Sequence, residues 1–249
     1  MTSDRITEKD RYEAHARALL AAPGSSITRS VDGPELHLRA PYQCFSRHAQ
    51  ELIAPDSTVL ELGAGTGAVS LTLADLTDRF FALDIAPGCI AFSQSADSRI
   101  RGVCGDMAQV PVATSSVDVV ASAGSLSYAD PFEVDREIVR VLKPGGSLLV
   151  VDTMNHNPVF RLNRWINYRR GRRTLSTVQR MPSHSRIARL ARNFDRHSVE
   201  YFGAADFMQP TFAKVIGPDA ASKMVMKLNI PHSYAAFKFV MVCTGLRKS

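Results

Sequence analysis

The sequence predicts an α/β fold, with a doubly wound, Rossmann-like sheet and helices on both of its faces. The apolar run from Thr58 to Leu62 is typical of a buried parallel strand, and it leads directly into a glycine-rich turn and a helical pattern. Further short apolar runs alternate with helical stretches as far as Asp152. The chain has 249 residues and 45% hydrophobic content, which suffices for one sizeable core. A single structural domain is therefore expected.

The residues before this core predict helices. Residues 5–22 carry apolar and small residues at helical spacing and end at Pro23-Gly24, a usual helix stop. Residues 27–38 alternate weakly and predict a short hairpin, and residues 42–53 predict a helix packed on the first strand. We expect residues 1–55 to form a helical cap.

Glu61 stands two positions before three alternating glycines, Gly63, Gly65 and Gly67. The glycine spacing alone also fits the dinucleotide fingerprint, so it does not choose a cofactor. A dinucleotide would bring its pyrophosphate to this turn, where a carboxylate would repel it. A ligand that carries a sulfonium and an ammonium group would instead be attracted to Glu61.

The stretch from Val59 to Gly67 resembles motif I of the class I S-adenosylmethionine (SAM)-dependent methyltransferases. Further matches follow in the order expected of that family over about residues 57–153. They are a strand at 79–84 that ends in Asp84, a strand at 100–104 before Gly105-Asp106-Met107, a strand at 116–122, and a helix, turn and strand at 138–152. The resemblance implies SAM as cofactor and a seven-stranded sheet whose last strand is antiparallel.

The resemblance also implies roles for single residues. Asp84 would hold the ribose, Asp106 would accept from the adenine amino group, and Met107 would pack on the ring. In related enzymes an aromatic residue of the N-terminal helices covers the methionine part, and Tyr12 and Tyr42 are candidates. The predicted cofactor contacts are Glu61, Gly63, Gly65, Gly67, Asp84, Ile85, Asp106, Met107, Ser122 and Tyr12.

The core, residues 56–249, includes two further predicted segments, an acceptor-binding insertion at about 154–195 and a lid-like apolar stretch at about 204–230. The expected elements after Asp152 are a loop at 153–158, helices at 160–169 and 183–191 with a turn at Gly171, a sixth strand at 198–202 and a closing strand at 234–246.

Ten arginines and no acidic residue lie between Arg161 and Arg192, more positive charge than the net +6 of the whole chain. Arginine rather than lysine favours forked recognition of phosphate or carboxylate. We predict that an anionic acceptor contacts Arg169, Arg170, Arg172 and Arg173. The alternative is a pair of solvated helices whose arginines pair with acids elsewhere in the fold.

A general base would come from the loops after the fourth or fifth strand, because acceptors in such sheets bind beyond the carboxyl ends of the strands. His156 is the best candidate by chemistry and position, followed by Tyr128, with Asp152 weaker. The seven histidines show no metal-ligand spacing, so no metal is expected.

Composition narrows the class of protein. The four cysteines are scattered without a C-x-x-C pair, as in reduced cytosolic proteins, and the polar N-terminus predicts no signal peptide. No apolar run approaches the roughly 20 residues that span a bilayer, so we expect a cytoplasmic protein. The loop after the fourth strand lacks the Pro-Pro-aromatic and Pro-Cys signatures of nucleic-acid methyltransferases, and no nucleic-acid partner is expected. Oligomeric state stays open.

The acceptor is the open question. Residues 38–42 and 157–165 look similar to bacterial methyltransferases of surface-polysaccharide and other glycan pathways. This second resemblance implies O-methylation of a lipid-linked or nucleotide-linked glycan hydroxyl, with possible peripheral membrane contact. The competing readings are an O- or C-methyltransferase of a natural-product or quinone-type small molecule, a SAM-binding module without catalysis, and an NAD(P)-dependent oxidoreductase.

Overall fold

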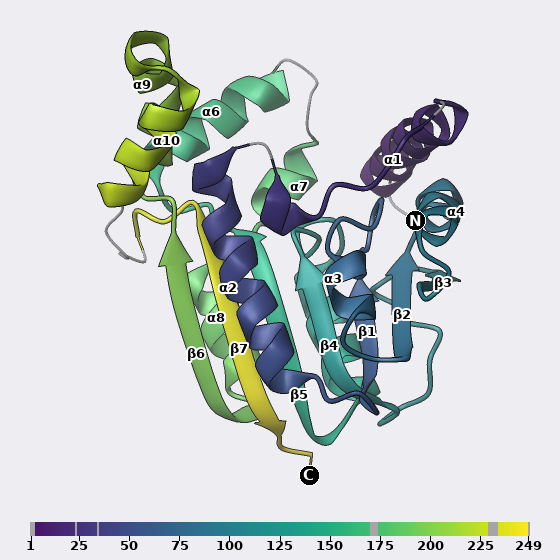
Figure 1. Cartoon of the computed structure of the whole chain (residues 1–249). Coiled ribbons are helices and arrows are strands. Elements are labelled where there is room, and N and C mark those ends of the chain that lie inside the picture. Colours follow the sequence, from purple (N-terminus) through teal and green to yellow (C-terminus); the bar gives the residue numbers. More distant parts are fainter. Residues whose placement is uncertain (1–2, 23, 34, 170–173, 229–233, 249) are drawn as a thin grey trace.

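A computed structural model of the chain describes residues 3–22, 24–33, 35–169, 174–228 and 234–248. Within them, seven strands form one mixed sheet in the order β3-β2-β1-β4-β5-β7-β6 (Figure 1). The strands are β1 (Thr58–Leu62), β2 (Arg79–Asp84), β3 (Arg101–Cys104), β4 (Val117–Ala123), β5 (Leu142–Thr153), β6 (Phe194–Phe202) and β7 (Lys238–Leu246). β1 to β5 are parallel, and β7 runs antiparallel between β5 and β6. The predicted doubly wound sheet with an antiparallel last strand is confirmed.

Helices cover both faces of this sheet and its carboxyl end (Figure 1). They are α1 (Ser3–Ala21), η1 (Ser30–Asp32), α2 (Leu36–Leu52), α3 (Ser70–Ala74), α4 (Pro87–Ala96), α5 (Pro131–Val141), α6 (Pro158–Arg169), α7 (Leu175–Gln179), α8 (His184–Ala191), η2 (Asp206–Met208), α9 (Gln209–Ile216) and α10 (Pro218–Lys227). None of the described helices has both the length and the apolar character needed to cross a membrane.

The core has one layer on each face of the sheet. On one face, Ile138 of α5 and Leu190 of α8 join buried strand residues such as Leu148 in the larger apolar cluster. On the other face, Phe45 of α2 and Leu73 of α3 pack with strand residues in a second cluster. Because helices cover both faces of β1, β4 and β5, the sequences of these strands contain continuous apolar runs. These runs are the pattern from which the strands were predicted.

Local chemistry sets where the helices begin. Asp130 caps α5, its side chain accepting hydrogen bonds from the backbone N–H groups of Phe132 and Glu133, while Pro131 supplies a first helical residue that has no N–H to satisfy. Ser183 caps α8 in the same way through Arg186 N. Both helices therefore start one residue after a capping side chain.

Several elements differ from the sequence expectations. The hairpin predicted at 27–38 is wrong: this stretch holds η1 and the first turn of α2, which begins at Leu36 rather than near Tyr42. α2 packs mainly against β5 and β7 instead of the first strand. The weak alternation around Asp32 does not mark a strand, since none of the described residues of this stretch pairs with a strand of the sheet.

The predicted lid-like stretch at about 204–230 is mostly helical over its described residues, as η2, α9 and α10. α7 is a further helix that sequence periodicity did not predict, because its five residues are too few for a periodic signal. Gly171, the predicted turn, lies outside the described residues. The division into a cap at 1–55 and a core at 56–249 stays a prediction.

Candidate active site

A cavity of about 260 Å³ lies where the sheet order reverses between β1 and β4, at the carboxyl ends of these strands. Its wall combines residues of α1, the turn after β1, the end of β2, and the loops after β3 and β4. Elements far apart in the sequence therefore meet at the one place where such folds bind ligands.

The glycine turn forms the floor of this cavity. Gly63 and Gly65 have φ angles of +69° and +54°, in the left-handed region that favours glycine. A Cβ at Gly63 would collide with the side chain of Ser125, whereas a Cβ at Gly65 would meet nothing within 4 Å. The space beside Gly65 is thus open cavity, and a ligand can approach bare backbone there. Gly67 does not line the cavity; a Cβ at this position would lie 3.0 Å from the side chains of Ile27 and Ser93.

Glu61 lines the cavity from below the glycine turn but is only 1% exposed. Ser70 Oγ donates a hydrogen bond of 2.5 Å to its Oε2. Burial raises the pKa of Glu61 to about 8, against the opposing effect of the Ser70 hydrogen bond. A cationic group placed nearby would favour the ionised form.

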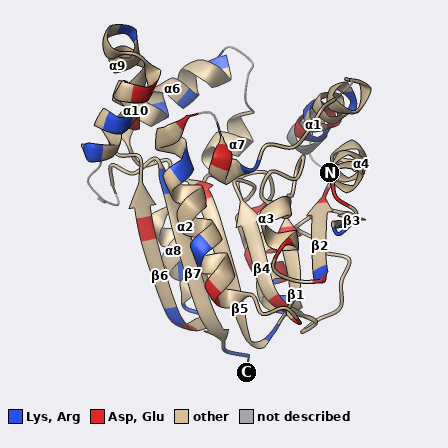
Figure 2. Ribbon diagram, viewed as in Figure 1, with Lys and Arg blue, Asp and Glu red and all other residues tan. Residues whose placement is uncertain are grey.

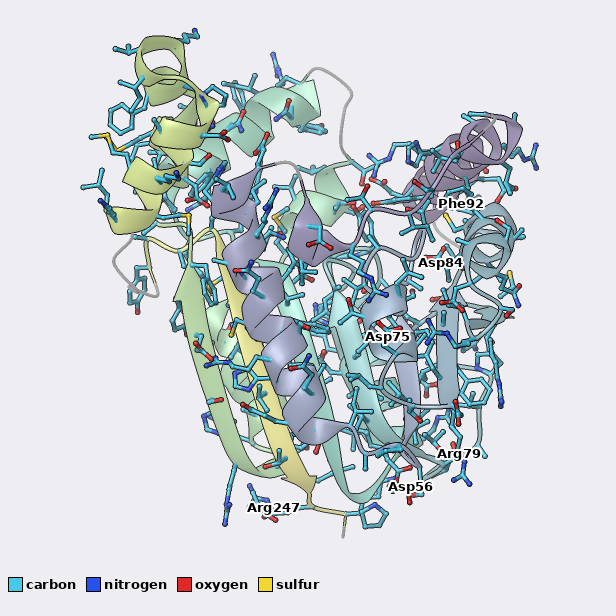
Figure 3. The ribbon with its side chains drawn as sticks, in the orientation of Figure 1. Asp56, Asp75, Arg79, Asp84, Phe92 and Arg247 are labelled. Carbon is cyan, nitrogen blue, oxygen red and sulfur yellow. The ribbon has the colours of Figure 1, made fainter. Side chains whose placement is uncertain are left out.

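Asp84 ends β2 and has two structural bonds of its own. Its Oδ2 accepts from Gly65 N at 2.8 Å and its Oδ1 accepts from Ala86 N at 2.9 Å. Burial raises its pKa, while these backbone donors act in the opposite direction. The carboxylate thus fixes the glycine turn and also lines the cavity with Ile85, near the carboxyl end of the sheet (Figure 3). Each oxygen has a second lone pair for a ligand hydroxyl.

The loop after β3 brings Asp106 and Met107 to the cavity, as predicted. Asp106 Oδ1 accepts from Ala108 N at 2.9 Å, which holds the loop in a tight turn. Met107 is half-buried and packs against the larger apolar cluster. A carboxylate beside a flexible thioether suits a flat heterocycle that carries an amino group.

Tyrosines of three elements line the opposite wall: Tyr12 of α1, Tyr42 of α2 and Tyr128 after β4. The hydroxyls of Tyr12 and Tyr128 share a hydrogen bond of 2.9 Å, and their rings meet edge to face. Burial and the neighbouring Tyr128 raise the pKa of Tyr12. Lys238 donates to the Tyr42 hydroxyl at 3.0 Å.

α1 also contributes Glu8 and Lys9 to the cavity wall. The sequence argument did not identify them, because nothing in their spacing distinguishes them from other surface residues of a helix.

Ser122 is not part of the cavity wall, contrary to the prediction. Its side chain is fully buried, and its Oγ shares a hydrogen bond of 2.8 Å with Ser125 Oγ. Ser125 lines the cavity and donates to Leu62 O at 2.6 Å. Successive strand residues point to opposite faces, so a count along the strand did not identify which serine lines the cavity.

His156 also lies outside the cavity wall. Its Nε2 accepts a hydrogen bond of 3.1 Å from the backbone N–H of His184, at the start of α8, and the two rings stack at 4.2 Å. Burial lowers its pKa, with added repulsion from His184 and Arg161. The nitrogen that would remove a proton is engaged at a helix N-terminus, so the geometry gives no support to a role as base.

The arginine-rich segment divides into different environments. Arg186 is buried and binds Asp135 at 2.8 Å, Arg189 binds the other oxygen of Asp135, and Arg164 donates to Met154 O. Arg169 is exposed at the end of α6, over the ring of Trp165 at 5.4 Å. Arg170, Arg172 and Arg173 lie outside the described residues. No arginine in the described part of the chain lines the cavity, where Lys9 is the basic residue.

A cluster of potential metal ligands lies elsewhere, between α2 and β6. Cys44, His48 and Glu200 place donor atoms within 4.8 Å of one another. Arg47 Nη2 lies against all three, 3.0 Å from Glu200 Oε1 and 3.5 Å from Cys44 Sγ and His48 Nε2. The Arg47 guanidinium thus lies where a metal cation would lie. These four side chains form an ion-pair and hydrogen-bond network that joins α2 to the edge strand β6.

Residues 60–150 match a protein family described as "Methyltransferase domain". The demethylmenaquinone methyltransferase of Renibacterium salmoninarum is 34% identical over 99 residues, which are 39% of this chain and 42% of that protein. Across the curated relatives, the chain spans between 18% and 42% of their length. The region matched by the family, residues 60–150, contains the glycine turn, Asp84 and Asp106.

Solved structures extend the similarity to nearly the whole chain. The geranyl diphosphate C-methyltransferase of Streptomyces coelicolor has a TM-score of 0.60 at 18% identity, covering 92% of this chain and 87% of its own. The cyclase SpnF has a TM-score of 0.62 at 17% identity, covering 99% of this chain and 97% of its own. At these identities the likeness concerns the fold. Residues 60–150 are therefore similar to a methyltransferase domain, and the chain shares the fold of these solved structures.

Proposed function

We propose that this protein binds SAM in the cavity at the carboxyl ends of β1, β2 and β4, and transfers a methyl group to a small-molecule acceptor. The observation that carries the proposal is the glycine turn beside three cavity-lining carboxylates, Glu61, Asp84 and Asp106. Negative charge beside the turn disfavours a pyrophosphate and favours a cationic ligand. The match of residues 60–150 to the methyltransferase family also supports SAM as the ligand.

The cavity residues fit SAM part by part. The open space beside Gly65 accommodates the ligand against bare backbone, and Asp84 has lone pairs for the ribose hydroxyls. Met107 and Ile85 supply apolar contact for the adenine, and Asp106 an acceptor for its amino group. Glu61 balances the positive charge of the amino-acid end. Bound SAM supplies an electrophilic methyl group, and the protein supplies alignment and exclusion of water.

For the acceptor, we favour a largely apolar small molecule of the quinone or natural-product class. The cavity wall formed by Tyr12, Tyr42 and Tyr128 is aromatic, and the small residue Ala129 adjoins it. None of the described arginines lines this wall. The similarity to a relative named as a demethylmenaquinone methyltransferase also supports an acceptor of the quinone class. Tyr128 would position an acceptor oxygen, because its hydroxyl faces the cavity and is already paired with Tyr12.

O-methylation of an anionic glycan is the second candidate. It is supported by the exposure of Arg161 and Arg169 on α6, which leaves both guanidinium groups open to an anionic ligand. An acceptor held by these residues would have to reach from α6 into the cavity. Either acceptor uses the same SAM site.

The test is turnover of purified protein with methyl-labelled SAM and a panel of quinone precursors, phenolic natural products and diphosphate-linked sugars. We expect labelled product from an apolar acceptor, reduced in the variant Tyr128→Phe and unchanged in Tyr168→Phe, which alters an exposed tyrosine of α6. Label in the sugar products alone would favour the glycan reading. SAM binding without any labelled product would support a non-methylating role, as the fold of the cyclase SpnF illustrates; tighter binding of a nicotinamide dinucleotide than of SAM would overturn the proposal.

A further inference from the structure

The outward side of α6 carries apolar side chains. Phe160 and Arg164, four residues apart, are buried and attach the helix to the domain. Away from them, Leu162 is 58% exposed and Trp165 is 53% exposed. The side of a surface helix that faces water is normally polar. α6 departs from this pattern, because Leu162 and Trp165 lie in solvent between exposed polar residues such as Arg161 and Asn163.

The α9–α10 hairpin has the same character. It is linked to α6 through η2, which contacts both α9 and α10, and whose Phe207 ring meets the Phe160 ring at 6.1 Å. α9 buries none of its residues, and its end carries Val215 at 81% exposure followed by Ile216. α10 is attached through Ala221, Ser222 and Val225, with Ser222 bonded to His37 of α2 at 3.2 Å. Its other side exposes two methionines and a leucine, Met224, Met226 and Leu228. The hairpin projects from the domain (Figure 1). Its exposed apolar side chains are therefore open to solvent.

Positive charge accompanies these apolar groups. The exposed charged residues of α6, α9 and α10 are Arg161, Arg169, Lys214, Lys223, Lys227 and Asp219. Figure 2 shows the blue segments on these helices at the upper left of the view. Basic side chains around exposed Trp, Leu and Val are the composition of protein surfaces that lie in the headgroup region of anionic bilayers.

We propose that α6 and the α9–α10 hairpin form a surface that binds an anionic lipid bilayer. We call it the membrane surface, comprising Leu162, Trp165 and Lys214–Ile216 together with the exposed residues of α10. The positive charge favours an anionic bilayer over a second copy of this chain as the occupant of this surface, because two such basic surfaces would repel each other. The membrane surface lies at the same end of the sheet as the cavity (Figure 1). That an acceptor enters from the bilayer rests on the proposed function; the binding itself does not.

The test uses the chain's one tryptophan, Trp165, as a built-in probe. Purified protein is titrated with vesicles of phosphatidylcholine alone or mixed with phosphatidylglycerol, in the absence of SAM and acceptor. We expect a blue shift of Trp165 emission and co-sedimentation with the anionic vesicles, both weakened by salt. The result does not depend on turnover, so failure here is distinct from failure of the proposed function.

Two variants locate the contact. Replacing Lys214, Lys223 and Lys227 with Gln should weaken vesicle binding by roughly a hundred-fold at low salt. The matched control replaces Arg79, Arg196 and Arg247 with Gln, removing equal charge; Figure 3 labels two of these near the far end of the molecule. Val215→Ser should remove the blue shift that remains at high salt, while Leu20→Ser on α1 should not.

Three results would overturn the proposal. One is equal loss of vesicle binding in the lysine variant and its arginine control, which would indicate a net-charge effect. Another is the absence of a Trp165 shift with anionic vesicles. The third is a shift that depends on protein concentration without lipid, which would assign the surface to self-association.

Discussion

Glu61 and Asp84, two carboxylates that line the same cavity, are held in different ways. Glu61 is buried against a single hydroxyl, that of Ser70, so burial dominates and raises its pKa to about 8. Asp84 is buried as well but accepts two backbone N–H bonds, which offset part of the same effect. Similar residues at similar depth therefore have different chemistry, because the number of donors around each differs.

Glu61 should exchange a proton when SAM binds. With a pKa of about 8, it is mostly protonated at pH 7, and a cationic ligand that lowers this pKa would release about 0.9 proton per site. Isothermal titration calorimetry in buffers of different ionisation enthalpy measures this number. Glu61→Gln should bind SAM more weakly by about 1–3 kcal/mol and release no proton. Glu200→Gln, outside the cavity, is the control; an unchanged proton release in Glu61→Gln would show that another group titrates.

Gly65→Val should remove SAM binding and leave the protein folded. The added side chain would enter open cavity space and adopt a φ of +54°, which costs about 1–2 kcal/mol in a non-glycine residue. Gly145→Val is a matched control, since Gly145 has a φ of +77° and equally open surroundings but lies outside the cavity. We expect similar losses of thermal stability in circular dichroism, with affinity reduced roughly a hundred-fold in Gly65→Val alone. Retained affinity would mean that this turn is not the site.

At the scale of elements, α1 is attached across the cavity by polar contacts rather than by a large apolar face. Glu13 accepts from Gly88 N at the start of α4, and Tyr12 bonds Tyr128. Thr177 of α7 lies within hydrogen-bond distance of Glu8. α8 is fixed more firmly, because its Arg186 is buried and bonded to both Asp135 and Leu126 O.

The attachment of α8 should depend on Asp135. Asp135→Asn would leave Arg186 buried beside a neutral group, and the free energy of unfolding should fall by about 3–5 kcal/mol. Asp195→Asn breaks an exposed pair with Arg247 and should cost about 1 kcal/mol or less. Urea unfolding followed by circular dichroism measures both. Equal effects in the two variants would contradict the assignment of Arg186 and Asp135 as the attachment of α8.

At the scale of the whole molecule, the order of the strands creates the cavity. β1 leads to β2 on one side and β4 lies on its other side, so the loops that follow these strands diverge and leave space between them. Since the cavity is lined by α1, β1, β2 and the loops after β3 and β4, a ligand there contacts much of the fold. Ligand binding should therefore be visible in global stability.

SAM should raise the melting temperature of the intact protein. A ligand at a hundred times its dissociation constant adds about 2.7 kcal/mol to the stability of the folded state, roughly 5–11 °C for a chain of this size. The measurement is differential scanning fluorimetry with SAM, its demethylated product and a nicotinamide dinucleotide. A larger shift with the dinucleotide than with SAM would contradict the cofactor assignment.

The amino-acid pattern was enough to predict the sheet and several residues of the cavity wall. Buried parallel strands have apolar runs that stand out in any window, and the glycines and carboxylates at their ends occur at spacings set by local geometry. Glu61, Gly65, Asp84 and Asp106 could therefore be placed before any coordinates, as could the strands from Thr58 to Asp152.

Which neighbouring side chains reach the cavity, and which face solvent, became clear from the three-dimensional structure. Ser125 replaces Ser122, Gly67 serves packing, and His156 caps a helix, because these outcomes depend on contacts between segments distant in sequence. The arginines of the segment 161–192 likewise differ because their partners in the fold differ. Arg186 is bound by Asp135, whereas Arg169 is exposed. Charge and hydrophobicity are properties of residues, but burial and partnership are properties of the fold.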